Sequence, residues 1–344
     1  MPVQSGAKSC AHTMTHFLED ILRQPSELQR AIDYLSGSGW PTLAAAAAAV
    51  RGARDVYLTG IGASWHAALN AGSLLHLGGR PAYLLDAAEL LHFAAIPSDA
   101  VIVILSRSGR SVEIVRLLAK ARDSRTTVIG LTNSAEGALA RESQIPLVVP
   151  ATLDHGISVN TYSTLALAGG ALARATLGAF DSRFATSLSK VVADADRAIG
   201  RWQQQIEEDS TWLEAATTPY FLARGSSLGS CYEARLLWEE GVKSPATSMG
   251  TGTFRHGPQE IAVKGSRFGM WIDRKRMREE DLAVARDLQR LGGSVMLIGQ
   301  RLPEDAGDLV FPTSSDAARM AILDRHLPGA TRGGASLATI ASRL

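Results

Sequence analysis

Cysteine is scarce in this chain of 344 residues, which contains only Cys10 and Cys231. The two lie far apart in the sequence and form no C-x-x-C pair, so neither a disulfide framework nor a cysteine-based zinc site is expected. Because structural disulfides mark oxidising compartments, their expected absence makes the cytoplasm the predicted location.

Long hydrophobic runs and an excess of charge are also lacking. The longest apolar run, around residues 43–50, is mostly alanine and too short to span a bilayer, and the N-terminus lacks the charged start and apolar core of a signal peptide. The formal net charge is +1, so neither nucleic acid nor an acidic membrane surface is expected as a partner. With 46% hydrophobic and 20% charged residues, the chain has the composition of a soluble enzyme or binding protein.

What the sequence does contain is a regular alternation of short apolar runs with helical patterns. It begins near residue 56, is interrupted by a long helical region from Asn160 to about Gln205 with a break at residues 178–181, and restarts near residue 219. Such alternation predicts an α/β fold with parallel sheets covered by helices on both faces. We expect two tandem three-layer αβα domains, and the chain then divides into an N-terminal helical segment, a first domain, a second domain and a tail at residues 1–40, 41–200, 201–330 and 331–344.

The most informative stretch follows the apolar run 101–105 and reads Ser106-Arg107-Ser108-Gly109-Arg110-Ser111. The pattern predicts a strand, a polar loop and the start of a helix. Unpaired amides and the positive end of the macrodipole attract an anion there, and hydroxyls and arginines can add to it; the alternative is an ordinary serine-rich turn. Because the loop has neither the P-loop pattern nor the dinucleotide fingerprint, a smaller phosphate ester fits better.

Three further polar clusters fall where predicted strands end. They are Gly62-Ala63-Ser64, Thr132-Asn133-Ser134 and the stretch from Asp154 to Thr161, which includes Asn160. Ligands of open α/β sheets gather at the carboxyl ends of strands, so clusters at a common edge predict one pocket. The corresponding strand of the second half is followed by Arg274-Lys275-Arg276 rather than a serine–glycine loop, and we therefore expect one phosphate site, in the first half.

Candidate catalytic groups lie in the second half. Glu233 and Glu240 are seven residues apart and thus on one face of a predicted helix, and His256 follows sixteen residues after Glu240 in an Arg-His-Gly-Pro loop. A carboxylate can move a proton between C1 and C2 of a sugar, and an imidazole can assist opening of the sugar ring. The alternative is a solvated helix face and a common loop.

In combination these motifs resemble the tandem sugar isomerase (SIS) domain family and, within it, the isomerase half of the glucosamine-6-phosphate synthases. The resemblance covers nearly the whole chain from Phe17 onward. It rests on Gly62-Ala63-Ser64, the loop from Ser106 to Ser111, the segment from Thr132-Asn133 to Leu139-Ala140, Arg224-Gly225, and His256-Gly257-Pro258 at the family's distance from Glu240.

The resemblance implies two SIS-type domains, no cofactor, and a homodimer whose subunits share the active site. It implies binding of a hexose 6-phosphate by Gly62, Ser64, Ser106, Arg107, Ser108, Gly109 and Ser111, with Asn160 and Thr161 at a second edge. Glu240 would be the acid/base, Glu233 a supporting or amine-binding group, and His256, from the neighbouring subunit, the group that assists ring opening. No metal site is expected, because the histidines do not fall at ligand spacing with carboxylates or cysteines.

The chain departs from the family pattern at two lysines and at its start. The helix lysine falls on Leu237 and the tail lysine near Thr339, so a Schiff base to the ketose has no obvious amine. The sequence begins Met1-Pro2-Val3-Gln4 without room for a glutaminase domain, so glutamine is not expected as the nitrogen source.

We therefore predict a glutamine-independent isomerase or deaminase of an amino-sugar or ketose 6-phosphate, with proton transfer between C1 and C2. Three alternatives remain: a deglycase of a sugar–amine 6-phosphate adduct, a simple aldose–ketose phosphate isomerase, and a non-catalytic sugar-phosphate sensor.

Overall fold

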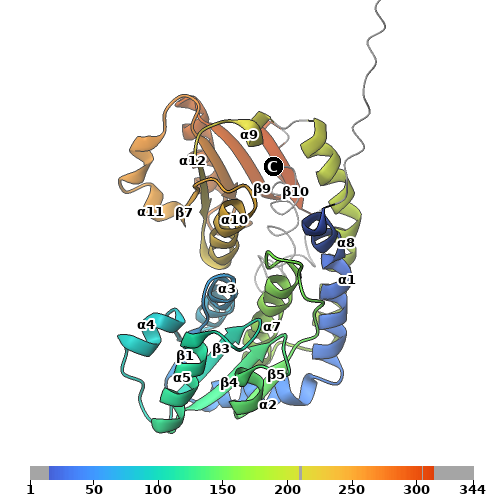
Figure 1. Cartoon of the computed structure of the whole chain (residues 1–344). Coiled ribbons are helices and arrows are strands. Elements are labelled where there is room, and N and C mark those ends of the chain that lie inside the picture. The colour runs from blue at the N-terminus through green and yellow to red at the C-terminus, as the bar shows by residue number, and fades with distance from the viewer. Residues whose placement is uncertain (1–14, 209–210, 304, 314–344) are drawn as a thin grey trace, which may run out of the picture.

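The computed structural model describes residues 15–208, 211–303 and 305–313, and these residues form two five-stranded parallel sheets (Figure 1). The strand order is β2-β1-β3-β4-β5 in the first sheet and β7-β6-β8-β9-β10 in the second. The second sheet thus repeats the first, with β6 corresponding to β1 and β8 to β3. The strands are β1 (Val56–Thr59), β2 (Tyr83–Leu84), β3 (Val101–Ser106), β4 (Thr127–Thr132), β5 (Ile145–Val148), β6 (Pro219–Ala223), β7 (Thr247–Gly250), β8 (Arg267–Trp271), β9 (Ser294–Gln300) and β10 (Leu309–Thr313).

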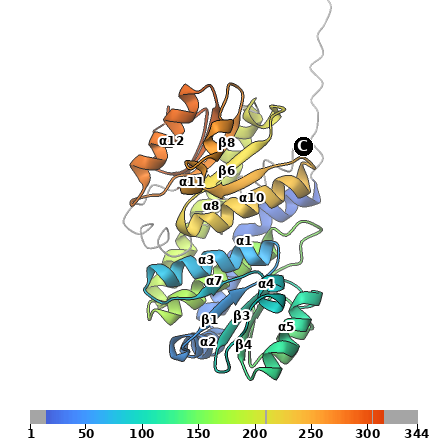
Figure 2. The same ribbon diagram turned by 90° about the vertical axis from the view of Figure 1, so that its left-hand side faces the viewer.

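Helices connect the strands and cover both faces of each sheet (Figures 1 and 2). They are α1 (His16–Ser36), α2 (Trp40–Gly52), α3 (Ala63–Leu77), α4 (Ala87–His92), α5 (Val112–Asp123), α6 (Ala138–Glu142), α7 (Asn160–Thr176), α8 (Ser182–Glu208), α9 (Thr211–Glu214), α10 (Leu228–Gly241), α11 (Thr251–Phe254) and α12 (Arg278–Arg290), with short 3-10 turns at Gly225–Ser227 and Pro258–Ile261.

Successive residues of the buried strands point to opposite faces of the sheet and pack into two separate hydrophobic cores in each unit. In the first sheet, Val103 and Leu105 pack with α1, α2, α3, α7 and α8, whereas Ile102 and Ile104 pack with α4, α5 and α6. The second sheet likewise has α8, α9 and α10 on one face and α11 and α12 on the other. A strand buried on both faces has to be apolar throughout, which is why the run 101–105 is continuous rather than alternating.

Helices α3 and α10 lie side by side between the two sheets (Figures 1 and 2). They approach so closely that a Cβ at Gly229 of α10 would lie 2.2 Å from Oδ1 of Asn70 and 2.4 Å from the carbonyl oxygen of His66. Along α10 the contacts pass from Asn70 at Gly229 to His66 at Glu233, so the two helices run in opposite directions. The start of α3 and the end of α10 therefore lie near the carboxyl edge of the first sheet, and the end of α3 and the start of α10 lie near that of the second.

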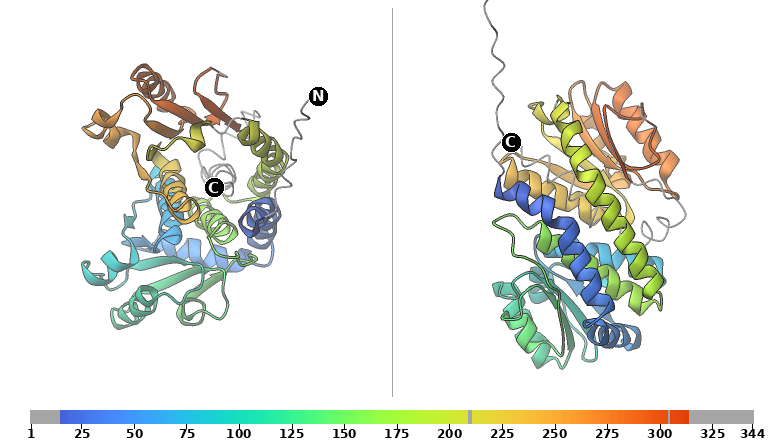
Figure 3. Two further views of the ribbon diagram at one scale, coloured as in Figure 1. Left: turned by 45° about the horizontal axis from the view of Figure 1, so that its top comes forward. Right: turned by 90° about the vertical axis from the view of Figure 1, so that its right-hand side faces the viewer.

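The N-terminal helix α1 packs beside α8 and α7 (Figure 3). The Thr15 hydroxyl accepts a hydrogen bond from the Leu18 amide at 3.1 Å and so caps the helix. Proline at position 25 favours either two helices or one kinked helix, and α1 is a single helical segment with Pro25 inside it. The buried face of the helix, with Ile21, Leu28 and Ile32, outweighs the one amide hydrogen bond that proline removes.

The α/β class with two parallel-sheet units is confirmed, as are the long helices α7 and α8 with their break at residues 177–181. Helix α8 runs across position 200, where the sequence analysis divides the chain. Strand β7 is missed because its residues, Thr-Ser-Met-Gly, form a half-buried edge without an apolar run. Cys231 is buried and free, whereas Cys10 and Thr339 lie outside the described residues. Within the described ranges, no helix is long and apolar enough to cross a membrane.

Candidate active site at the edge of the first sheet

The predicted phosphate loop connects β3 to α5. The Ser106 hydroxyl accepts a hydrogen bond from the Gly109 amide at 3.1 Å, and the Ser108 hydroxyl accepts one from the Arg110 amide at 3.3 Å. Gly109 has a φ of +61°, and a Cβ there would lie 2.8 Å from Cβ of Leu139, so the turn requires glycine. Ser111 is the N-cap of α5 but makes no side-chain capping hydrogen bond. Its hydroxyl therefore leaves the first-turn amides of α5 open to an anion.

Neighbouring loops hold the phosphate loop in place. The Arg107 carbonyl accepts hydrogen bonds from the Thr132 hydroxyl at 3.1 Å and from the Asn133 amide at 3.2 Å. Because β1 adjoins β3, the turn at Gly62, with a φ of +55°, and the partly buried Ser64 in the first turn of α3 lie at the same edge. The predicted serine clusters are thus brought to one edge of the sheet.

The start of α7 forms the other side of this edge. The Asp154 carboxylate caps the helix by accepting hydrogen bonds from the Asn160 amide at 2.7 Å and from the Thr161 amide at 3.1 Å and hydroxyl at 2.5 Å. Asn160 and Thr161 are both fully buried, so their side chains lie beneath the protein surface rather than on it. Among the described residues, neither polar atom of the Asn160 side chain has a hydrogen-bond partner.

The second unit contributes Glu240 from the C-terminal turn of α10. The residue as a whole is exposed, but its carboxyl is partly buried, and this burial raises the pKa of Glu240. The positive charges of Lys243 and Arg107 lower this pKa, and the negative charge of Glu239 raises it. Arg107 also donates a hydrogen bond to the Ser158 hydroxyl at 3.3 Å. Arg107 of the phosphate loop therefore lies within electrostatic range of a carboxylate that comes from the other sheet.

Glu233, two turns earlier on α10, lies in the α3–α10 interface rather than at the sheet edge. It is 2% exposed, and its Oε2 lies 2.7 Å from Nδ1 of His66. Burial raises the pKa of Glu233, the hydrogen bond and charge of His66 lower it, and the negative charges of Glu240 and Asp154 raise it. Among the described residues its Oε1 has no hydrogen-bond partner. Sequence reasoning missed His66, because nothing in the sequence links a helix of one half to a glutamate 167 residues away.

The remaining predicted positions are placed as follows. His256 is exposed in the turn after α11, and in the described part of the chain no hydrogen bond or ion pair joins it to Glu240 or Glu233. Leu237, at the family's lysine position, is buried against Ile21 and Val159, so an apolar contact replaces the amine.

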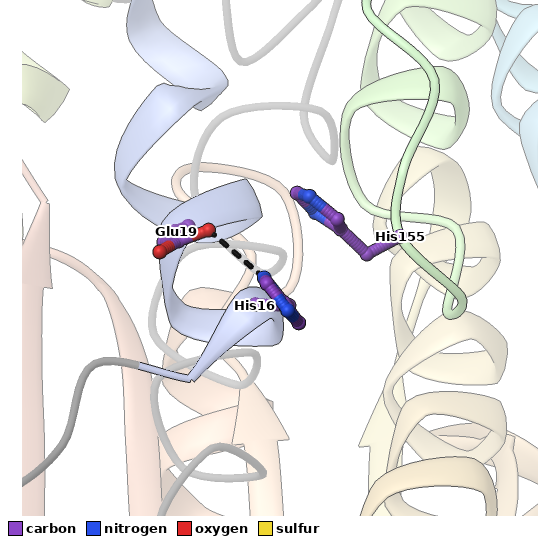
Figure 4. A group of neighbouring side chains, drawn as sticks. All are labelled: His16, Glu19 and His155. Atoms are coloured by element: carbon purple, nitrogen blue, oxygen red, sulfur yellow. Dashed lines mark hydrogen bonds and ion pairs between the residues drawn. The ribbon is translucent and has the colours of Figure 1, made fainter.

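The structure also assembles a cluster that the sequence spacing does not indicate (Figure 4). His16, Glu19 and His155 present side-chain ligand atoms within 4.8 Å of one another. Nδ1 of His16 lies 3.2 Å from Oε2 of Glu19, and the rings of His16 and His155 stack at 4.4 Å. Within the described ranges these three side chains are the group that could hold a metal ion. Both histidines are exposed. Nδ1 of His155 already forms a hydrogen bond with Oδ1 of Asp20 at 3.0 Å.

Comparisons with known proteins identify relatives of this chain. Residues 49–173 match the SIS domain, a range that contains β1 to β5 and the phosphate loop. The isomerizing glutamine–fructose-6-phosphate aminotransferase of Pyrobaculum aerophilum is 26% identical over 256 residues, which cover 73% of this chain and 42% of that enzyme. The match thus spans less than half of that relative's length.

Solved structures show the same fold. The C-terminal domain of glucosamine-fructose-6-phosphate aminotransferase from Francisella tularensis has a TM-score of 0.83 at 18% identity, covering 96% of both chains. A glucosamine-6-phosphate deaminase from Thermotoga maritima has a TM-score of 0.71 at 21% identity, covering 92% of this chain and 93% of the other. Residues 49–173 therefore belong to the SIS domain family, and the chain is homologous to the isomerase half of the glutamine–fructose-6-phosphate aminotransferases.

Proposed function

We propose that the protein is a glutamine-independent enzyme that isomerises or deaminates an amino-sugar 6-phosphate, with Glu240 as the acid/base. The observation that carries this proposal is the electrostatic influence of Arg107, in the phosphate loop, on the pKa of Glu240 on α10. An anion-binding loop of the first unit and a carboxylate of the second therefore lie within electrostatic range of each other. A substrate with a phosphate at one end and a reacting carbon at the other would span them.

The phosphate is held by the first turn of α5. The Ser106 and Ser108 hydroxyls shape the loop by accepting its amides, and Ser111 and Ser64 supply hydroxyls at the ends of two helices. The dianion gains from the helix dipole and from Arg107. Asn160 and Thr161, being buried, support the α7 edge from below.

Glu240 moves the proton between C1 and C2. Its ionised carboxylate takes the C2 proton of the open-chain amino sugar and returns it to C1, while a proton of the C2 amine passes to O1, which leaves an imine at C2 and a hydroxyl at C1. Water then adds, and the products are the ketose 6-phosphate and ammonia. A raised pKa suits this work, because a base that titrates nearer to neutrality both accepts and returns the proton readily.

Glu233 and His256 have different roles in this proposal. Glu233, buried and bonded to His66, positions α10 against α3 and so places Glu240. His256 is assigned to ring opening in the active site of a second subunit, as the family resemblance implies, which makes the functional unit a homodimer with a shared site.

The experiment is a turnover assay with glucosamine 6-phosphate, fructose 6-phosphate and sugar–amine 6-phosphate adducts as separate substrates, following ammonia, ketose phosphate and exchange of the C2 proton. Glu240→Gln is expected to lower kcat about 10²-fold or more. The matched control is Glu239→Gln, which removes a neighbouring carboxylate that pairs with Arg235 on the helix surface and should leave kcat within a few-fold.

The readouts separate the alternatives. Ammonia release from glucosamine 6-phosphate identifies the deaminase, proton exchange without ammonia identifies the simple isomerase, and turnover confined to the adducts identifies the deglycase. Binding of sugar phosphates without turnover would identify the sensor and overturn the catalytic assignment. The sensor is favoured by one observation, the buried Leu237 where the family has a lysine.

A further inference from the structure

A second cavity lies at the corresponding edge of the second sheet. Its volume is about 520 Å³, and it is lined by residues 224–227 after β6, residues 272–277 after β8, the ends of β9 and β10, and Leu77 at the end of α3. Because β6 and β8 correspond to β1 and β3, this is the position that the phosphate loop occupies in the first unit. It is also a topological switch point, where ligands of open α/β sheets bind.

The wall of this cavity is strongly basic. It carries four cationic side chains and one carboxylate, namely Arg224, Arg274, Lys275, Arg276 and Asp273. Nε of Arg224 is paired with Asp281 at 2.6 Å, but the exposed Lys275 and Arg276 make no ion pair within the described part of the chain. Two cations thus remain at the mouth of a concave site on a protein whose formal net charge is only +1.

The loop after β8 binds its own carboxylate where the first loop would bind an anion. Oδ1 of Asp273 accepts hydrogen bonds from the amides of Lys275 at 2.8 Å, Arg276 at 2.6 Å and Met277 at 3.1 Å. Because these amides are occupied, an external anion has to be held by side-chain cations. The loop after β8 therefore has no serine–glycine pattern, but it carries the positive charge of Lys275 and Arg276 that an anion requires.

Three residues of the cavity wall have buried polar atoms without a hydrogen-bond partner among the described residues. Trp271, Gln300 and Thr313 line the cavity, are at most 5% exposed, and each has a buried polar atom (Nε1, Nε2 and Oγ1) without a hydrogen-bond partner among the described residues. An unsatisfied buried donor is energetically unfavourable, and the indole N–H and the amide NH₂ can only donate. These atoms are themselves buried, so a ligand would reach them only after local movement of the wall.

Apolar side chains complete the wall. Leu77, Ile272, Met277 and Ile298 also line the cavity, so an occupant with only charge and no carbon skeleton would leave them unused. The volume falls within the range of small-molecule sites.

We propose that this cavity binds a small phosphate ester, held by Lys275 and Arg276 at the phosphate and by the apolar wall at its carbon skeleton. The site is distinct from the candidate active site, since Ser64 and Leu77 lie at opposite ends of α3, about 20 Å apart along the helix. The inference does not rest on the proposed function. It replaces the expectation of a single phosphate site.

The test is titration calorimetry on the full chain with the first site disabled by Ser108→Ala and Ser111→Ala. Inorganic phosphate, glucosamine 6-phosphate and adenosine monophosphate are the probes. Addition of Lys275→Gln and Arg276→Gln is expected to weaken ester binding about tenfold or more, through loss of charge-assisted contacts. The matched control, Arg54→Gln with Lys264→Gln, removes the same charge from exposed positions outside the cavity and should change the Kd less than about twofold.

Tighter binding of either ester than of inorganic phosphate, lost with Lys275 and Arg276 but not in the control, supports the proposal. Tighter binding of adenosine monophosphate would mean that the apolar wall contacts a nucleobase. Tighter binding of glucosamine 6-phosphate would mean that it contacts a hexose. The inference is overturned if no probe binds once the first site is disabled, if the control weakens binding equally, or if inorganic phosphate binds as tightly as both esters. All four changed side chains of the test and control are surface charges, and circular dichroism verifies that each variant is folded.

Discussion

Replacement of His66 by leucine should destabilise the protein by an amount that grows with pH. In the structure His66 makes the hydrogen bond that lowers the pKa of the buried Glu233, while burial raises it. Leucine fills similar space without a polar atom, so the carboxyl would lose the one hydrogen-bond partner it has among the described residues, and its pKa would rise further. A group whose pKa is higher in the folded than in the unfolded state gives stability that is present below the unfolded pKa and lost as pH rises through the folded pKa.

The magnitude follows from the protonation state of Glu233. Near the ordinary glutamate pKa of 4.5 the carboxyl is largely neutral in the folded variant, and the loss is that of a neutral hydrogen bond, about 1 kcal/mol. At about pH 8 the variant must either bury an unpaired carboxylate or bind a proton, and breaking a buried pair costs about 3–5 kcal/mol. We therefore expect the deficit of His66→Leu to increase by about 2 kcal/mol between these conditions.

Urea denaturation followed by tryptophan fluorescence at both pH values measures the deficit. Glu233→Gln keeps a polar partner for His66 but cannot ionise, so its stability relative to the native chain should rise with pH. The double variant His66→Leu, Glu233→Leu should recover much of the loss, since apolar replacement of a whole buried pair is often neutral. An equal deficit at both pH values, or a double variant as unstable as His66→Leu, would refute the reasoning.

Three further predictions concern the candidate site. Lys243→Gln removes a positive charge that lowers the pKa of Glu240, so the acid limb of the kcat/KM profile should move to higher pH; an unchanged limb would exclude Glu240 as its source. Gly109→Ala, at a φ of +61° with 2.8 Å to Leu139, should lower the free energy of unfolding by about 1–3 kcal/mol, whereas Gly156→Ala, with open space around it, should be close to neutral in the same denaturation assay. Mixing refolded Glu240→Gln and His256→Ala subunits should restore about a quarter of native activity if the site is shared across a twofold interface; no recovery despite mixed dimers would place both groups in one subunit.

The sequence predicts the parts of the fold that depend on local patterns. Strand β3 and helix α5 are foreseen because a wholly apolar run, a hydroxyl-rich turn and an amphipathic helix follow each other directly. Pro25 alone leaves two helices or one kinked helix open, and the packing of α1 against α7 and α8 decides for a single helix. Strand β7 has no pattern of its own and exists because β6 offers it a partner edge.

The candidate site is predictable only where its residues share a loop. The serine loop is found from its order in the sequence, whereas the pairing of His66 with Glu233 and the cluster of His16 with His155 arise from tertiary packing. The second cavity is missed for a different reason. Its loop binds Asp273 on its own amides and carries lysine and arginine, so a search for a second serine–glycine loop finds nothing there.

The opposed course of α3 and α10 has a consequence for how this chain can vary. Helix α3, which follows the Gly62 turn of the first unit, ends at Leu77 beside the cavity of the second unit, and α10 of the second unit brings Glu240 towards the phosphate loop of the first. Under the proposed function, a fragment with one unit alone would have the phosphate loop without Glu240, or Glu240 without the phosphate loop. The two units share one sheet topology, but this exchange of helix ends would make each of them necessary for the activity of the other.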